Sequence, residues 1–202
     1  MPKKQPKNLI IIIDFDNVLF DRNGKFARAS KKAGVDLSSG AKLYQQIKAE
    51  NNGVYNFKKH LKLIANATSM PLYKLEQNMK QVFQKAPEFL FKGVDKILEN
   101  LRQQADKLIL ASRGNFYFQN EKIANSGLSK FFDEIVISEK PKTEALAGQI
   151  TAWHAQNKTM LFIDDNLIEI KAVKKIFPYI KCLRIKQGSQ HSLKKICQSQ
   201  FL

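Results

Sequence analysis

Hydrophobic residues along the chain form short, uninterrupted runs that are separated by stretches with helical spacing. Five of these runs have the length of a strand and consist mainly of Ile, Leu and Val. They cover residues 9–13, 108–111, 135–137, 160–163 and 180–185. Continuous apolar runs of this kind predict strands that are buried on both faces, which is typical of a parallel sheet.

Helical patterns lie between the later runs. In "GVDKILENLRQQ" the residues Val94, Ile97, Leu98 and Leu101 share one face of a helix, and "TEALAGQITAWHAQ" is a second helical stretch. Strands that alternate with helices predict an α/β fold in which a doubly wound, mainly parallel sheet carries helices on both faces.

Residues 23–87 interrupt this alternation. They contain three helical patterns, "GAKLYQQIKAEN", "VYNFKKHLKLIANA" and "MPLYKLEQNMKQVFQK", with Ser69 as a candidate cap and Pro71 suited to a first helical turn. One crossover rarely needs so many residues, so we expect a helical lid over the end of the first strand, with ordinary crossover helices as the alternative. The predicted organisation is an α/β core of residues 1–22 and 88–202 with an inserted helical cap of residues 23–87.

Length and composition indicate one globular unit. The chain has 202 residues, of which 44% are hydrophobic and 26% charged. No apolar run reaches the roughly 18 residues of a transmembrane helix, and the stretch before residue 9 has no apolar segment of the signal-peptide type. We therefore expect a cytoplasmic protein without a membrane partner. Cys182 and Cys197 form no metal or redox spacing.

The net charge of +16 is the unusual bulk property, and it is unevenly distributed. No acidic residue follows Glu169, and the basic residues after it are Lys171, Lys174, Lys175, Lys181, Arg184, Lys186, Lys194 and Lys195. Such a field attracts phosphorylated ligands and polyanions, but it is also what a solubilising surface provides. The sequence shows no aromatic-plus-Arg pattern and no zinc-finger spacing, so a nucleic-acid partner is possible but not required.

Polar residues follow the predicted strands where each strand ends. In an open α/β sheet, ligands bind outside the carboxyl ends of the strands. Asp14 and Asp16 follow the first run, Ser112 the second, and "SEKPK" the third. Asp164 and Asp165 follow the fourth run. Four acids, a hydroxyl and a lysine are therefore expected at one edge of the sheet.

Several carboxylates at close range repel one another unless a cation accompanies them. Magnesium binds to one or two carboxylates together with water and phosphate oxygens, whereas zinc prefers His or Cys. None of His60, His154 or His191 follows a strand in this way, so we expect packing or surface roles for them. The predicted cofactor is Mg²⁺ and the predicted partner is a small phosphorylated substrate. A carboxylate could then act as a nucleophile and a second carboxylate could move protons.

In these polar residues and their order along the chain, the sequence resembles the haloacid dehalogenase superfamily, most of whose members are magnesium-dependent phosphohydrolases. The stretch "DFDNVL" matches the first family motif, D-x-D-x-[T/V]-L, and the strand "LILAS" matches the second. The resemblance implies that Asp14 is the nucleophile, that Asp16 is the general acid/base and that Ser112 binds the phosphoryl group. It also implies that the Asp14 carboxylate and the Asp16 backbone carbonyl bind the metal.

The later motifs extend the resemblance to about residue 185. "KPKTEAL" is similar to the third motif and favours Lys140 as the phosphate-binding lysine, although Lys142 is close enough to compete. "MLFIDDN" is similar to the fourth motif, which implies that Asp165 binds magnesium and that Asp164 supports it. The inserted helices occupy the place of the family's small helical cap.

Two residues of the motifs have more than one interpretation. Many phosphatases of the family carry Gly or Thr where this chain has Asn17. Its side chain either faces the cap or the substrate, or closes the loop after the strand. Arg113 either reaches a substrate phosphate or pairs with a carboxylate of the cap.

Three hypotheses for the function follow from these observations. The first is a Mg-dependent phosphomonoester hydrolase that forms an aspartyl-phosphate on a small metabolite or nucleotide. The second is the same chemistry on nucleic-acid ends, which the charge suggests. The third is a non-catalytic binding or regulatory protein, which the intact set of motif residues argues against. A dehalogenase is less favoured because it would leave the metal-binding set without a purpose.

Overall fold

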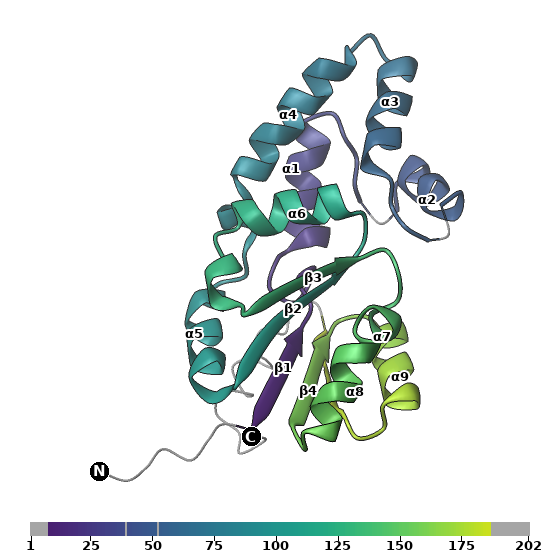
Figure 1. The fold of residues 1–202 in the computed structure, drawn as a ribbon. Helices are drawn as coiled ribbons and strands as arrows, with labels where there is room; N and C mark the ends of the chain where they lie inside the picture. The colour runs from purple at the N-terminus through teal and green to yellow at the C-terminus, as the bar shows by residue number, and fades with distance from the viewer. Residues whose placement is uncertain (1–7, 39, 52, 187–202) are drawn as a thin grey trace.

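A computed structural model describes residues 8–38, 40–51 and 53–186 of the chain. Its centre is a parallel sheet of five strands in the order β3-β2-β1-β4-β5 (Figure 1). The strands are β1 (Leu9–Ile13), β2 (Lys107–Arg113), β3 (Glu134–Ser138), β4 (Thr159–Asp164) and β5 (Lys181–Arg184). The predicted α/β class and all five predicted strands are confirmed. Cys197, His191, Lys194 and Lys195, for which we made predictions, lie outside the described residues.

The isoleucine run forms the central strand β1 because each of its faces is buried by different helices. Ile11 and Ile13 point to the side covered by α5 and α6, whereas Ile10 and Ile12 point to the side covered by α8 and α9. All four isoleucines are at most 1% exposed. Side chains alternate along a strand, so a strand covered on both faces needs apolar residues at every position.

The helices enclose the sheet from two sides and extend beyond its carboxyl edge (Figure 1). On one face lie α5 (Val94–Gln104), α6 (Phe116–Asn125) and the 3₁₀ turn η3 (Ser129–Phe131); on the other lie α7 (Lys142–Ala145), α8 (Ala147–Ala155) and α9 (Leu167–Ile176). The chain runs from β1 to β2 and β3 and then returns to β4 on the other side of β1. The strand order therefore reverses next to β1, which is where such sheets bind ligands.

The segment between β1 and α5 is helical, as predicted. It contains the π-helical turn η1 (Arg22–Phe26), α1 (Ala27–Lys32), α2 (Lys42–Ala49), α3 (Phe57–Ala67), α4 (Leu72–Gln84) and the 3₁₀ turn η2 (Ala86–Phe89). Helices α2, α3 and α4 lie beyond the end toward which β1 points (Figure 1). Helices α3 and α4 and the loop before α3 pack on Phe118 of α6, whose ring lies 5.1 Å from those of Tyr55 and Phe57 and 5.8 Å from that of Phe83. The division into a core and a separate cap remains a prediction.

Two local predictions need correction. Ser69 is not the cap of α4, because Pro71 occupies the N-cap position and the helix begins at Leu72. The fixed φ of proline is compatible with the extended backbone of an N-cap residue, and the N–H that proline lacks is not needed at that position. The stretch expected as one helix over residues 143–156 consists of two, α7 and α8, which are separated at the buried Leu146 with φ −107° and ψ 1°.

Histidines and cysteines of the described chain serve packing, as expected. The Nδ1 atom of the buried His60 lies 2.8 Å from the Tyr55 hydroxyl, and the ring of His154 stacks on Tyr179. Cys182 is a half-buried free thiol. Within residues 8–38, 40–51 and 53–186, no helix has both the length and the apolar character needed to cross a membrane.

Candidate active site

Three aspartates meet at the point where the strand order reverses. Asp14 follows β1, Asp164 is the last residue of β4 and Asp165 comes next. The backbone N–H of Asp14 donates to the carbonyl of Ile163 at 2.9 Å, so the pairing of β1 with β4 sets the two strand ends side by side. One carboxylate oxygen from each aspartate lies within 4.8 Å of the others. Asp14 and Asp164 are 7% and 1% exposed.

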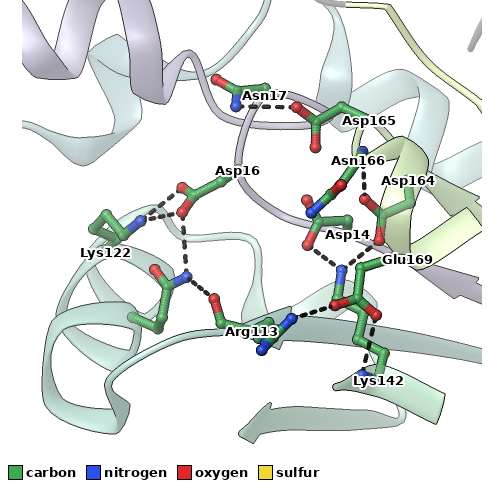
Figure 2. A network of polar contacts seen from close by, with 11 residues as sticks. Asp14, Asp16, Asn17, Arg113, Lys122, Lys142, Asp164, Asp165, Asn166 and Glu169 are labelled. Atoms are coloured by element: carbon green, nitrogen blue, oxygen red, sulfur yellow. Dashed lines mark hydrogen bonds and ion pairs between the residues drawn. The ribbon is translucent and has the colours of Figure 1, made fainter. Parts of the chain in front are cut away.

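Lys142 neutralises part of this cluster (Figure 2). Its Nζ atom lies 2.5 Å from Oδ1 of Asp14 and 2.6 Å from Oδ2 of Asp164. Burial opposes the charged form of this lysine, but the two carboxylates outweigh it and raise the pKa of Lys142 above its ordinary value. The ammonium is therefore a fixed positive charge between two of the three carboxylates.

The remaining negative charge is not balanced by the described residues. Three carboxylates against one ammonium leave two negative charges in a buried site. Burial, together with the charges of Asp164 and Asp165, raises the pKa of Asp14 well above its usual value, although Lys142 acts in the opposite direction. Burial and Asp164 likewise raise the pKa of Asp165 to about 6. A divalent cation would relieve both effects, because it favours the ionised carboxylates.

The structure corrects the preference for Lys140 over Lys142. The Lys140 side chain is 69% exposed and its Nζ contacts Glu144, one helical turn along. Pro141 has extended backbone and makes Lys142 the first residue of α7, where its side chain reaches the ends of β1 and β4. Two lysines that are two residues apart are thus separated by the start of a helix.

Asp16 lines the same cavity as Asp14, but its carboxylate has different partners (Figure 2). Both of its oxygens lie 2.6 Å from Nζ of Lys122, and Gln119 donates to one of them at 3.2 Å. The Lys122 side chain is fully buried, whereas that of Asp16 is 20% exposed. The two motif aspartates are therefore held apart, each by its own lysine.

Lys122 lies in an aromatic cage on the core side of α6. Its Nζ is 4.8–5.8 Å from the ring centroids of Phe15, Phe20, Phe26 and Phe118. Burial lowers the pKa of Lys122, and the charge of Asp16 counteracts this. The ring faces add favourable contacts for a cation, so carboxylate and rings together retain the ammonium in the core.

Asn17 closes the loop after β1 and also reaches the aspartate cluster. It has φ +60°, in the left-handed region that Asn adopts more readily than most residues. Its Nδ2 donates to Asp165 at 3.1 Å, and its Oδ1 accepts from the backbone of Asn23 at 3.2 Å. The side chain thus fixes the loop and orients one oxygen of Asp165, and it also lines the cavity.

Ser112 and Arg113 lie at the end of β2, as predicted. The Ser112 hydroxyl is buried, and none of the described residues forms a hydrogen bond with its Oγ. In the described part of the chain, Arg113 pairs with no carboxylate of the helical segment. Its guanidinium lies 3.0 Å from Glu169 of the core helix α9.

Glu169 and Lys122 are among the residues of the site that sequence reasoning missed. Glu169 is 3% exposed and accepts both from Arg113 and from the backbone N–H of Lys142 at 3.1 Å, so it fixes the start of α7. Its sequence signal was an acid in the first turn of a helix after the Asp-Asp pair. Lys122 was signalled by its position four residues after Phe118, which places a charge on the apolar face of a helix.

A cavity of about 650 Å³ lies over the strand ends and is lined from both sides. The core contributes Asp14, Asp16, Lys142 and Asp165, while η1, α2 and the loop before α3 contribute Arg22, Tyr44, Lys48 and Tyr55. The volume suits a small organic ligand. The lining therefore combines the aspartates of the strand ends with cations from both the core and the helical segment.

Comparison with known proteins agrees with this architecture. The sequence model of the haloacid dehalogenase-like hydrolases matches residues 11–179. No curated protein sequence matches the chain significantly. Among solved structures, a haloacid dehalogenase-like hydrolase from Burkholderia xenovorans LB400 has a TM-score of 0.69 at 18% identity, over 96% of this chain and 89% of that one.

Two further structures are similar at lower scores. The HAD-hydrolase YfnB from Bacillus subtilis, bound to magnesium, has a TM-score of 0.55 at 16% identity, over 93% of this chain and 99% of that one. L-2-haloacid dehalogenase from Xanthobacter autotrophicus, with chloropropionic acid covalently bound, has a TM-score of 0.58 at 16% identity, over 96% of this chain and 83% of that one. Likeness at such low identity shows the shared fold. The family match over most of the sequence shows that the chain belongs to the haloacid dehalogenase-like hydrolases.

Proposed function

We propose that this hydrolase is a magnesium-dependent phosphatase that removes the phosphoryl group from a small phosphorylated metabolite or nucleotide. The observation that carries the proposal is the pairing of two differently equipped carboxylates in one cavity. Asp14 belongs to a cluster with excess negative charge around Lys142, and Asp16 lies beside it on a separate lysine. Phosphoryl transfer to a carboxylate needs one group that attacks and another that moves protons.

In this proposal Asp14 is the nucleophile. One of its oxygens attacks phosphorus, the bond from phosphorus to the alcohol oxygen breaks, and Asp16, which must enter this step in its protonated form, gives its proton to that leaving oxygen. Asp16 then takes a proton from water, the water oxygen attacks the aspartyl-phosphate, and the bond to Asp14 breaks to release inorganic phosphate. Lys122 and Gln119 hold the carboxylate that makes both proton transfers.

Other residues bind and orient the phosphoryl group. Lys142 neutralises its oxygens and keeps Asp14 in place, and Glu169 fixes the backbone of Lys142. We assign the Ser112 hydroxyl to a phosphoryl oxygen because its buried oxygen has no described partner, although Ser112 lies behind the residues that line the cavity.

The oxygen-donor set of Asp14, Asp165 and the supporting Asp164 fits a hard divalent cation. Magnesium, when bound there, would offset the charge of the aspartates and of the phosphoryl group. We further propose that residues 23–87 act as the cap, because side chains from this segment form the outer wall of the cavity.

A dehalogenase is the main alternative, since one similar structure carries covalently bound chloropropionic acid. Attack of Asp14 on carbon expels a halide ion, which needs neither a proton donor nor a cation-binding cluster. The ion pair between Lys122 and Asp16 and the excess charge around Asp14 both favour phosphoryl chemistry.

The test is turnover of p-nitrophenyl phosphate with magnesium and with EDTA. We expect activity that needs magnesium and that Asp14→Asn abolishes without unfolding the protein. Lys140→Gln is the matched control, because its side chain is exposed on the loop beside the site. Turnover that survives in Asp14→Asn contradicts the proposal, as does release of chloride from 2-chloropropionate by a protein inert toward phosphate esters.

A further inference from the structure

Two cations that do not contact the aspartate cluster also line the cavity. Arg22 is the first residue of η1 and Lys48 lies in the last turn of α2. Both approach the ring of Tyr44: the Arg22 guanidinium carbon lies 4.7 Å and the Lys48 Nζ 5.7 Å from its centroid. All three residues line the cavity. A single aromatic ring thus gathers two positive charges on one wall.

These cations lack an acidic partner among the described residues. The Arg22 side chain donates to the neutral Oδ1 of Asn23 at 2.7 Å, although Arg22 is only 9% exposed. Neither Arg22 nor Lys48 forms an ion pair with a carboxylate in the described chain. By contrast, the buried cations Lys142 and Lys122 on the core side are both paired.

Such an arrangement is unfavourable unless an anion joins it. A buried charge costs free energy when it is unpaired, and two like charges at close range add repulsion. Burial and the nearby Arg22 and Arg113 lower the pKa of Lys48, which agrees with an environment too rich in positive charge. Arg binds carboxylate and phosphate groups with two parallel hydrogen bonds, so an anionic group of a ligand satisfies it directly.

In the proposed function the phosphoryl group binds beside Asp14 and Lys142, whereas Arg22 and Lys48 are gathered around the ring of Tyr44. We propose that the substrate carries a second anionic group, a carboxylate or another phosphate, and that Arg22 and Lys48 bind it. This inference rests on the proposed phosphatase function and narrows its substrate class to phosphate esters with two anionic ends.

Matched pairs of substrates test the proposal. In the first pair, glycerol 3-phosphate has a hydroxymethyl group where 3-phosphoglycerate has a carboxylate. In the second pair, fructose 1,6-bisphosphate has one phosphate more than fructose 6-phosphate. In at least one pair we expect kcat/KM to be about tenfold or more higher for the member with the extra anion, as hydrogen bonds to charged groups predict. The pair that shows the preference identifies the second group as a carboxylate or a phosphate.

Variants assign the preference to the two cations. We expect Arg22→Gln and Lys48→Gln each to lower kcat/KM for the preferred member at least fivefold more than for its partner, mainly through KM. Lys62→Gln is the matched control, since Lys62 is exposed on α3 of the same segment and does not line the cavity. Circular dichroism and thermal unfolding verify that each variant folds; if Arg22→Gln does not, Lys48→Gln alone carries the test. Higher ionic strength is expected to weaken the preference.

The outcomes separate this inference from the proposed function. Turnover of p-nitrophenyl phosphate that depends on magnesium and Asp14, together with equal kcat/KM within both pairs, overturns the second anion site and leaves the phosphatase intact. If no phosphate ester is hydrolysed, calorimetric titration of the folded protein with each member of the pairs still applies. Equal affinities within both pairs then also overturn the inference, and tighter binding of the doubly anionic member that is lost in Lys48→Gln supports it.

Discussion

Removing the buried ammonium beside Asp16 tests whether Lys122 and Asp16 act as one unit. Lys122→Met keeps the length of the side chain and its packing among the phenylalanines but leaves the Asp16 carboxylate without its two contacts of 2.6 Å. Because the Asp16 side chain is 20% exposed, water replaces part of the lost contact. We expect a loss of about 2 kcal/mol in the free energy of unfolding.

The reciprocal change, Asp16→Asn, should cost more. It leaves the ammonium of Lys122 without its carboxylate, and because the Lys122 side chain is fully buried, water cannot replace the carboxylate. We expect a loss of about 3 kcal/mol, since the four phenylalanine rings and an amide offset only part of the unpaired charge. The double variant Asp16→Asn/Lys122→Met holds neither charge and should lose only about 2 kcal/mol, which gives a coupling of about 3 kcal/mol.

Urea unfolding in magnesium-free buffer measures the free energy of unfolding of the unaltered protein, the two single variants and the double variant, which together form a double-mutant cycle. Lys171→Met, an exposed change on α9, is the control and should leave the unfolding midpoint unchanged. In the same proteins, turnover should fall about 100- to 10,000-fold whenever Asp16 is replaced, including in the stable double variant. If the double variant loses the sum of the two single losses to within about 0.5 kcal/mol, the reasoning is refuted, because the stability effects of independent sites add to that accuracy.

The remaining predictions concern the lysine, the metal and a buried histidine. Lys142→Met should abolish turnover of p-nitrophenyl phosphate while Lys140→Met stays within about twofold, since only Lys142 contacts Asp14 and Asp164. Magnesium should raise the melting temperature more at pH 7.5 than at pH 5. The pKa of Asp165 is about 6 without metal, so protons compete with the cation for this carboxylate at pH values below 6. An equal shift of the melting temperature at both pH values would contradict this. Burial lowers the pKa of His60 to about 4, so between pH 7 and 5 the unfolded chain takes up a proton that the folded protein does not. Urea unfolding should therefore show a loss of about 2 kcal/mol on acidification that is missing in His60→Gln; the same loss in that variant would exclude His60 as its source.

Much of the core followed from the sequence because its signals are local. The isoleucine run could only be a strand covered on both faces, and the acids that end two such runs had to meet at one edge of a parallel sheet. Asp14, Asp164 and Asp165 do so. These predictions depend on the alternation of elements, which needs no knowledge of side-chain partners.

What the sequence could not supply are contacts that depend on tertiary packing. Lys140 and Lys142 flank one proline, and only the start of α7 determines which of them turns inward. Lys122 pairs with an aspartate 106 residues earlier, and its position on an apolar helix face signals a buried charge without naming the partner. Arg22 and Lys48 come together only because both approach Tyr44. Pairings of this kind arise from geometry that no local pattern encodes.

Helix α6 contacts both the helical segment and the carboxylate of Asp16. Phe118 packs against Tyr55 and Phe57 of the helical segment, and Lys122, one turn further along, holds Asp16. The packing of the helical segment and the position of the Asp16 carboxylate are therefore linked through a single turn of one helix.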